Sequence, residues 1–152
     1  MSTVDRFVSA QQDHYAQALA ELRAGRKTGH WIWFVLPQLR GLGRSAMAQT
    51  YGIADRTEAE AYLAHPLLGA RLVECVAALL AHAALSADDI LGAIDAMKTR
   101  SCLTLFEAVA SDERRHLFAQ ALERFYAGQR DEATLALLQD KQKAGASRHR
   151  PC

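Results

Sequence analysis

Cysteine, proline and long apolar runs are scarce in this chain, and each scarcity excludes a class of protein. Three prolines in 152 residues, beside a hydrophobic share of 50%, argue against a disordered polypeptide. The cysteines Cys75, Cys102 and Cys152 are odd in number and lack Cys-x-x-Cys spacing, so we expect reduced thiols and no disulfide framework. The longest apolar stretch, over residues 75–85, is interrupted by His82 and is too short to span a membrane.

Signals for targeting, metals and cofactors are also missing. The first residues lack the basic and then apolar pattern of a secretory signal, so we expect a cytoplasmic protein that does not contact membranes. The net charge of +1 and the pI near 7.8 lie far below those of a dedicated nucleic-acid-binding domain, which disfavours nucleic acid as a partner. No His, Cys, Asp or Glu set has metal-ligand spacing, and no phosphate-binding glycine loop occurs. We therefore predict no metal and no cofactor.

Alanine and leucine at helical spacing are what the chain has in abundance. One apolar face recurs at i, i+4, i+7, i+8, i+11 and i+12, which is typical of a central helix, and we expect Pro66 in the first turn of this longest helix. Strand-like alternation is nowhere sustained. We predict an all-α, single multihelical globular domain of about seven helices over residues 1–138, followed by a disordered basic tail over 139–152. The apolar face consists of Leu68, Leu72, Cys75, Val76, Leu79 and Leu80.

Local signals predict several helix ends. A first amphipathic helix is expected over residues 4–22, because its apolar residues fall on one arc. Ser45 and Ser86 are expected N-caps, since their side chains can accept a hydrogen bond from the first turn. Thr57 with Glu60 three residues later has the capping-box pattern.

The segment over residues 26–44 has a composition that ordinary helix packing does not need. It holds both tryptophans, four basic residues and four glycine or proline breakers, and residues 23–44 contain no Asp or Glu. Such a cluster predicts a surface that attracts a phosphate or carboxylate, because guanidinium groups bind those oxygens in pairs. Scattered surface charges around a turn are the alternative. The basic residues are Arg23, Arg26, Lys27, Arg40 and Arg44.

Aromatic and polar groups near this cluster are candidates for a site. Trp31 and Trp33 point about 160° apart on a helix, so one can line a pocket while the other joins the core. His30 is a candidate catalytic acid or base, with a structural histidine as the alternative. Gln11 interrupts the apolar stripe of the first helix, so its amide is either satisfied inside the core or directed into a site.

A second polar group follows about two-thirds of the way along the chain. Lys98, Ser101 and Thr104 share one arc of their predicted helix, and Arg100 adds a charge nearby. This strip either completes a pocket begun by the first cluster or is an ordinary solvated face.

Short motifs spread over most of the chain carry a family resemblance. They include Gly25-Arg26-Lys27, His30-Trp31-Ile32-Trp33-Phe34, Pro37-Gln38, Gly41-Leu42-Gly43 and, further on, Ala61-Tyr62-Leu63-Ala64-His65-Pro66. In these motifs, and up to about Leu138, the sequence resembles the domain-of-unknown-function 1810 family. The resemblance implies a multihelical domain and no particular activity. Some members are labelled calpastatin, but that inhibitor is a disordered chain, unlike this one.

A weaker likeness concerns one short helix. Asp13-His14-Tyr15-Ala16-Gln17-Ala18 is similar to the Glu-His-Tyr-x-Gln-Ala helix of the NADAR group of ADP-ribose glycosidases, although no acidic catalytic set maps onto this chain.

These observations support one leading hypothesis and two alternatives. The first is a polar pocket for a small anionic ligand, of nucleotide or ADP-ribose type; if the protein is an enzyme, it would hydrolyse a glycosidic or phosphate-bearing bond with His30 as proton carrier. The alternatives are a non-enzymatic module that binds a protein partner through the tryptophan segment, and a weak nucleic-acid binder. The predicted ligand-binding residues are Gln11, Arg26, Lys27, His30, Trp31, Trp33, Gln38, Lys98, Arg100, Ser101 and Thr104.

Overall fold

A computed structural model describes residues 3–149, with side chains up to residue 142. Within this range the chain forms ten α-helices and one isolated parallel bridge between Leu39 and Ile53. The expected all-α single domain is therefore confirmed, whereas about seven helices was too few, because short helices stand between the long ones. The helices are α1 (Asp5–Gln12), α2 (Tyr15–Ala24), α3 (Ile32–Val35), α4 (Ala46–Tyr51), α5 (Arg56–Ala64), α6 (Pro66–Leu80), α7 (Ala87–Leu91), α8 (Ala93–Val109), α9 (Arg114–Tyr126) and α10 (Glu132–His149).

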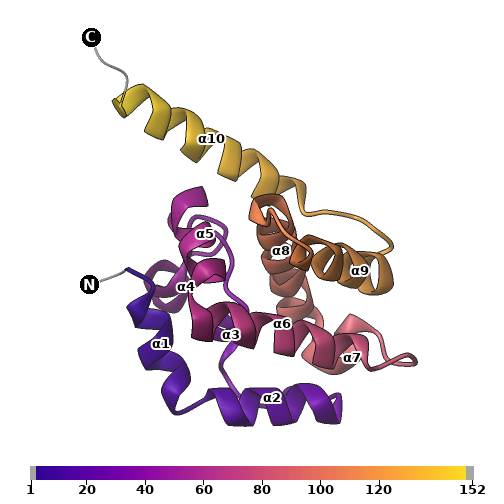
Figure 1. Ribbon diagram of the computed structural model, residues 1–152. Helices are drawn as coiled ribbons and strands as arrows, with labels where there is room; N and C mark the ends of the chain where they lie inside the picture. Colours follow the sequence, from indigo (N-terminus) through magenta and orange to yellow (C-terminus); the bar gives the residue numbers. More distant parts are fainter. Residues whose placement is uncertain (1–2, 150–152) are drawn as a thin grey trace.

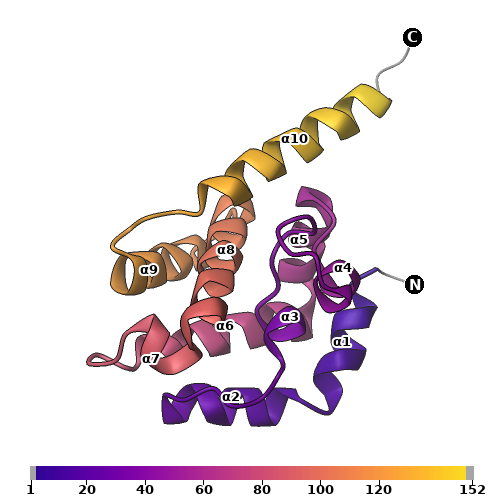
Figure 2. The ribbon, with the colours of Figure 1, turned by 180° about the vertical axis from the view of Figure 1, so that it is seen from behind.

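Helix α6 is the centre of the arrangement. Helices α1, α2, α5 and α9 all pack against it, while α8 packs against α9 and α10. Figures 1 and 2 show α1 and α2 on one side of α6, α8 and α9 on the other, and α10 crossing the end of α8 and running beyond the body. The short α3 packs against both α1 and α8, so it connects the two sides.

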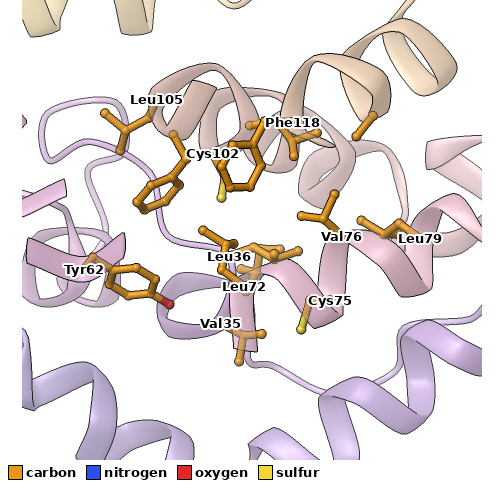
Figure 3. Close-up of a cluster of buried hydrophobic side chains, with 14 of the residues drawn as sticks. Val35, Leu36, Tyr62, Leu72, Cys75, Val76, Leu79, Cys102, Leu105 and Phe118 are labelled. Carbon is orange, nitrogen blue, oxygen red and sulfur yellow. The ribbon is translucent and has the colours of Figure 1, made fainter. Parts of the chain in front are cut away.

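The apolar face predicted for α6 is confirmed as the core. Five of its six residues are each 0 or 1% exposed, and Leu80 is partly buried against the core. Burial of a large apolar side chain contributes about 1.5–3 kcal/mol. In Figure 3, Val35 and Leu36 lie beside Leu72, with Tyr62 of α5 to one side and Phe118 of α9 above. The segment that carries the tryptophans is thus anchored in the core by the apolar residues that follow them.

Two predicted N-caps are confirmed and one capping box is wrong. The Ser45 side chain accepts a hydrogen bond from the N–H of Ala48, and Ser86 forms a complete capping box at the start of α7. Helix α5 begins at Arg56, earlier than the Thr57–Glu60 pattern predicted. The reason is Asp55, whose carboxylate accepts a hydrogen bond from the N–H of Glu58 at 2.9 Å.

The long helices also differ in length from the prediction. Pro66 does stand in the first turn of α6, and His65 caps that turn through its Nδ1. However, α6 has 15 residues, whereas α8 has 17 and α10 has 18. The longest helix is therefore α10.

The first predicted helix is two helices. Helix α1 ends at Gln12 and α2 starts at Tyr15, although no glycine or proline marks the break. Phe7 and Gln11 of α1 are buried where that helix meets α3 and α6, while Leu22 of α2 is buried against α6 further along. Two contact surfaces in different directions require two helix axes, and a stripe on a helical wheel does not reveal that requirement.

Helix α10 replaces most of the disordered tail predicted from residue 139. It continues to His149, and helix formers such as Lys141 and Gln142 follow its anchored part. Thr134 and Leu138 are buried where α10 packs against α5 and α8, so the first turns are held by the domain. Residues 150–152 of the predicted tail, including Cys152, lie outside the described range.

Both cysteines of the described range are unpaired and buried. Burial raises the pKa of the Cys75 thiol to about 12 and that of Cys102 well above its usual value. Thiols of this kind are poor nucleophiles, because the reactive form is the thiolate. Cys75 and Cys102 therefore act as small apolar residues of the core.

Among residues 3–149, no single helix has the length and apolar content needed to cross a membrane. Helices α5 and α6 meet that requirement only as a pair, and they are bent by 88° at their junction.

Gly69 allows α5 and α6 to cross closely. A Cβ at this position would lie 2.2 Å from the carbonyl oxygen of Leu63. Elsewhere in a helix, alanine is more stable than glycine by about 1 kcal/mol. We expect Gly69→Ala to do the opposite and lower the free energy of unfolding by roughly 2 kcal/mol or more in urea denaturation.

The matched control is Ala70→Gly, an exposed neighbour on α6, which should cost about 1 kcal/mol from helix propensity alone. If Gly69→Ala stabilised the protein, the close crossing would be refuted.

Candidate functional site

One carboxylate, Glu21 of α2, organises the loop that carries the tryptophans. Its oxygens accept hydrogen bonds from the N–H groups of Thr28 and Gly29 at 2.8 and 2.9 Å, and from Nε1 of Trp31 at 2.9 Å. The Gln17 amide donates another at 2.7 Å. Desolvation opposes ionisation of Glu21, but these hydrogen bonds outweigh it and lower the pKa to about 2. The loop is therefore held by an ionised side chain.

The two tryptophans lie in different environments. Trp31 is 2% exposed and belongs to the core, whereas Trp33 is half-buried and lines a cleft. The ammonium of Lys98 lies 5.1 Å from the centre of the Trp33 ring, which is the geometry of a cation–π contact. The Nε1 of Trp33 is buried and has no hydrogen-bond partner among the described residues.

Lys27 connects the loop to α8. Its Nζ lies 2.7 Å from a carboxylate oxygen of Asp95, and the two side chains are only 7% and 19% exposed. The same ammonium donates to the carbonyl of Gly29 and lies 4.9 Å from the centre of the Trp31 ring. The backbone N–H of Lys27 donates to the carbonyl of Ile90 at 2.7 Å. Two segments that are distant in the sequence thus meet at this point.

Two open clefts flank the first turns of α8, where Figure 2 shows α3 beside that helix. The first, of about 440 Å³, we name the tryptophan cleft, and the second, of about 400 Å³, the α8–α10 cleft. The tryptophan cleft is lined by Lys27, His30, Ile32, Trp33, Leu91, Gly92, Ala93, Ile94 and Asp95. The α8–α10 cleft is lined by Gln38, Leu42, Gly43, Ile94, Met97, Lys98, Arg100, Ser101, Asp131 and Ala133.

An apolar ridge separates the two clefts. It consists of Ile94 and Met97, whose exposed fractions are 72% and 66%. The two residues are three apart on α8, so their side chains are neighbours on the helix surface. Ile94 belongs to both linings, which places the ridge between the clefts.

Asp131, at the start of α10, closes the far end of the α8–α10 cleft. It accepts hydrogen bonds from the hydroxyl of Ser101 at 2.9 Å and from the N–H of Thr134 at 3.2 Å. The Thr104 hydroxyl accepts a hydrogen bond from the Asp131 N–H at 3.0 Å, which joins α8 to α10. Arg100 approaches Asp131 only to 3.8 Å, and its buried Nε has no partner within the described range.

His30 lies exposed at the tryptophan cleft. Within the described part of the chain, no hydrogen bond or ion pair fixes its ring, so its proposed role as a proton carrier has no orienting partner. No group of three or more His, Cys, Asp or Glu side chains in that part could hold a metal ion.

The structure brings seven predicted site residues to the two clefts and places four elsewhere. Gln11 is 1% exposed, and its amide donates to the carbonyl of Phe34 at 2.6 Å and to the hydroxyl of Tyr62 at 3.1 Å. The Gln11 side chain is therefore a hydrogen-bonded group of the core. Trp31 and Thr104 are also buried and hydrogen-bonded, while Arg26 is exposed on the loop. The seven are Lys27, His30, Trp33, Gln38, Lys98, Arg100 and Ser101.

The basic cluster of the sequence does not converge on one surface. Lys27 points inward to its carboxylate, Arg23 faces a glutamate of α6 at 3.6 Å, and Arg40 donates to a backbone carbonyl of α4 at 2.9 Å. Arg26 and Arg44 are exposed. Three of the five cations are thus engaged by different parts of the fold, as the alternative of scattered charges expects, and a single anion-attracting surface made by this cluster stays a prediction.

Several organising residues were not among the predicted site residues. Glu21 and Asp95 carry no local motif that distinguishes them from other helix carboxylates, and only the fold reveals what they bind. Ile94 and Met97, in contrast, could have been recognised in the sequence. A helical wheel of α8 places them opposite the buried residue Leu103, on the same side as Lys98. Apolar residues on a polar face indicate either a covered surface or a binding surface.

Comparison with known proteins identifies the family. The sequence matches the family described as "Protein of unknown function (DUF1810)" over residues 1–138. The chain belongs to this family. It is also similar to the crystal structure of the conserved hypothetical protein Rv1873 from Mycobacterium tuberculosis, with 46% identity, a TM-score of 0.86, and coverage of 90% of this chain and 96% of that one. No curated protein matches the chain.

Replacing Glu21 tests how this DUF1810 protein holds its tryptophan loop. Glu21→Gln keeps the size of the side chain and removes the charge that the loop N–H groups bind. Hydrogen bonds to charged groups contribute roughly 1.5–3 kcal/mol, so we expect the free energy of unfolding at neutral pH to fall by roughly 2 kcal/mol. Urea denaturation followed by tryptophan fluorescence measures it. Glu60→Gln, exposed on α5, is the control and should stay within about 0.5 kcal/mol of the wild type.

The wild type and Glu21→Gln should also differ in how their free energy of unfolding depends on pH. The pKa of Glu21 is about 2 in the folded protein and 4.5 ordinarily. Ionised Glu21 therefore stabilises the DUF1810 fold fully above pH 4.5, and that contribution is lost as the pH falls through 2. The difference in the free energy of unfolding between the wild type and Glu21→Gln should therefore become smaller as the pH falls through this range. A difference that is the same at neutral pH and at pH 2 would refute the assignment.

Proposed function

We propose that this protein is a non-enzymatic interaction module that binds a protein partner on the ridge of Ile94 and Met97. The exposure of these two side chains carries the proposal. Of the described residues, four large apolar side chains are exposed, and these two are the most exposed of them. An apolar surface of this kind on a folded domain, rimmed by polar residues, is typical of a protein-binding site.

The surroundings of the ridge extend its apolar surface. Trp33 lines the cleft on one side, and Leu42 lines the cleft on the other. Leu135, also exposed, lines a neighbouring cleft that shares Arg100 and Asp131 with the α8–α10 cleft. Three of the four exposed large apolar residues therefore gather in one region, with charged groups at its border, as in the core and rim of an interface.

The fold itself does not account for the ridge. Helix α8 buries its opposite face, including Leu103 and Phe106, and that face supplies the packing against α9 and the core. Ile94 and Met97, at 72% and 66% exposed, add little buried area to the folded chain. Their apolar character is explained if a partner covers them.

Site-specific cross-linking tests this proposal. A photoreactive benzophenone amino acid at Met97 should give a discrete covalent adduct with another protein in an extract of the native host. The matched control is the same amino acid at Leu67, which is 38% exposed on α6 and lies in neither cleft lining. Ile94→Asp in the Met97-labelled protein should remove the adduct, because a carboxylate in an apolar contact is costly to desolvate.

Adducts of equal yield at Met97 and Leu67, or adducts that survive Ile94→Asp, would count against the ridge as a docking site. Melting curves of each variant establish that the fold is retained.

A small anionic ligand in the α8–α10 cleft is the second candidate function. It is favoured by the lining, in which Lys98, Arg100 and Gln38 supply donors around a space of about 400 Å³, the size of many metabolite sites. A nucleotide or ADP-ribose derivative has the required phosphates. Hydrolysis of such a ligand by His30 would require it to extend into the tryptophan cleft, where His30 lies.

A thermal-shift series tests the ligand proposal. Inorganic phosphate, nucleotides and ADP-ribose are added to the wild type and to Lys98→Gln/Arg100→Gln. A ligand present at 100 times its Kd stabilises by about 2.7 kcal/mol, so binding in this cleft predicts a raised Tm in the wild type and none in the variant. An equal shift in both proteins would place the anion elsewhere.

A further inference from the structure

We infer that the ridge binds an amphipathic helix of the partner whose apolar stripe is flanked by acidic residues. This inference rests on the docking function proposed above and specifies the chemistry of the partner. Three observations support it: the shape of the surface, the two cations beside the ridge, and the engagement of the nearby carboxylates.

The shape of the surface is that of one side of a helix–helix contact. Helices pack by placing a row of side chains from one helix into the groove of the other. Ile94 and Met97 form such a row at i and i+3, and an open cleft lies on each side of it. An incoming helix can therefore place its own apolar side chains in the tryptophan cleft and in the α8–α10 cleft.

A cation borders the ridge on each side. On the helical wheel, Lys98 lies roughly 40° from Ile94, and Arg100 lies roughly 60° from Met97 in the other direction. Their side chains are 26% and 31% exposed. Within the described residues, neither side chain donates a hydrogen bond, and each is only 4.0 or 3.8 Å from a carboxylate oxygen. Neither cation therefore has a close carboxylate partner, and the other contact of the Lys98 ammonium is with the Trp33 ring, 5.1 Å from the ring centre.

The neighbouring carboxylates are already engaged. A carboxylate oxygen of Asp95 lies 2.7 Å from the buried ammonium of Lys27, so the contact between Asp95 and Lys98 is a second and longer one. Asp131 accepts the hydrogen bonds of Ser101 and of the first turn of α10. Asp95 and Asp131 are thus occupied within the fold, while Lys98 and Arg100 are partly exposed beside the ridge.

A second copy of this chain fits the surface less well. In a symmetric pair of ridges, the same patch meets itself, so Lys98 and Arg100 would approach other cations. Like charges facing each other across an interface disfavour the wrong partner. A partner helix with Glu or Asp beside its apolar stripe is complementary at both positions.

A display library of amphipathic helices tests the inference. Each peptide carries leucine at i, i+3, i+4 and i+7, and the positions flanking this stripe are randomised among Glu, Lys and Ser. The library is selected against the full-length wild type, against Lys98→Glu/Arg100→Glu, and against Met97→Asp. All three substituted side chains are partly or largely exposed, and circular dichroism with melting curves checks that each variant is folded.

The wild type should enrich Glu at the flanking positions, and the charge-reversed variant should enrich Lys. A selected acidic peptide should bind the wild type at least ~10-fold more tightly than its Lys counterpart, and the preference should weaken at high salt because rim charges are screened. Met97→Asp should reduce the binding of every selected peptide.

Three results would overturn the inference, and they differ in what they say about docking. Peptides that bind through Met97 with no preference for Glu over Lys would leave the docking surface in place and reject the acidic helix. Peptides whose binding is unaffected by Met97→Asp would reject the acidic helix and the docking function together. Concentration-dependent self-association of the free protein that Met97→Asp abolishes would assign the ridge to a second copy instead.

Discussion

The candidate surface depends on the contact between Lys27 and Asp95. The two charges are largely removed from water, and separating a buried pair typically costs about 3–5 kcal/mol, because an unpaired charge then remains. The backbone of Lys27 is bonded to Ile90 at the same point. Since Glu21 holds the other end of the loop through N–H groups and the Trp31 indole, the loop has one position relative to α8. The position of Trp33 beside the ridge follows from that constraint.

A loop fixed in this way means that the proposed binding surface is already formed before a partner binds. Ordering of loops and side chains is a large part of the free-energy cost of association, and a preformed surface avoids it. Helix α8 contributes by having two roles on two faces. Its inner face, including Phe106, packs in the core, and its first turns present Ile94 and Met97 outward. The core therefore determines the position of the ridge, although the ridge itself buries little area in the fold.

Local sequence signals predicted the parts of the fold that depend on neighbours in the chain. The apolar face of α6, the caps at Ser45 and Ser86 and the position of Pro66 each follow from spacing within a few residues. The break between α1 and α2 and the continuation of α10 depend on what those helices meet in three dimensions. Residues 13 and 14 contain no breaker, and the early turns of α10 are held by Thr134 and Leu138 against other helices.

The candidate site was less accessible from the sequence for a related reason. Motif clustering brought attention to Lys27, Trp33 and Lys98, and the structure places all three at the junction of the loop with α8. Motif clustering did not reveal that the Lys27 ammonium is paired with the Asp95 carboxylate, because a lysine in a sequence has the same charge whether it faces solvent or a carboxylate. Once that cation is counted as internal, the remaining exposed features are apolar residues with a cation on each side. Under the proposed function, this surface suits recognition of a helix better than capture of an anion, because charge would select the partner and apolar burial would stabilise the complex.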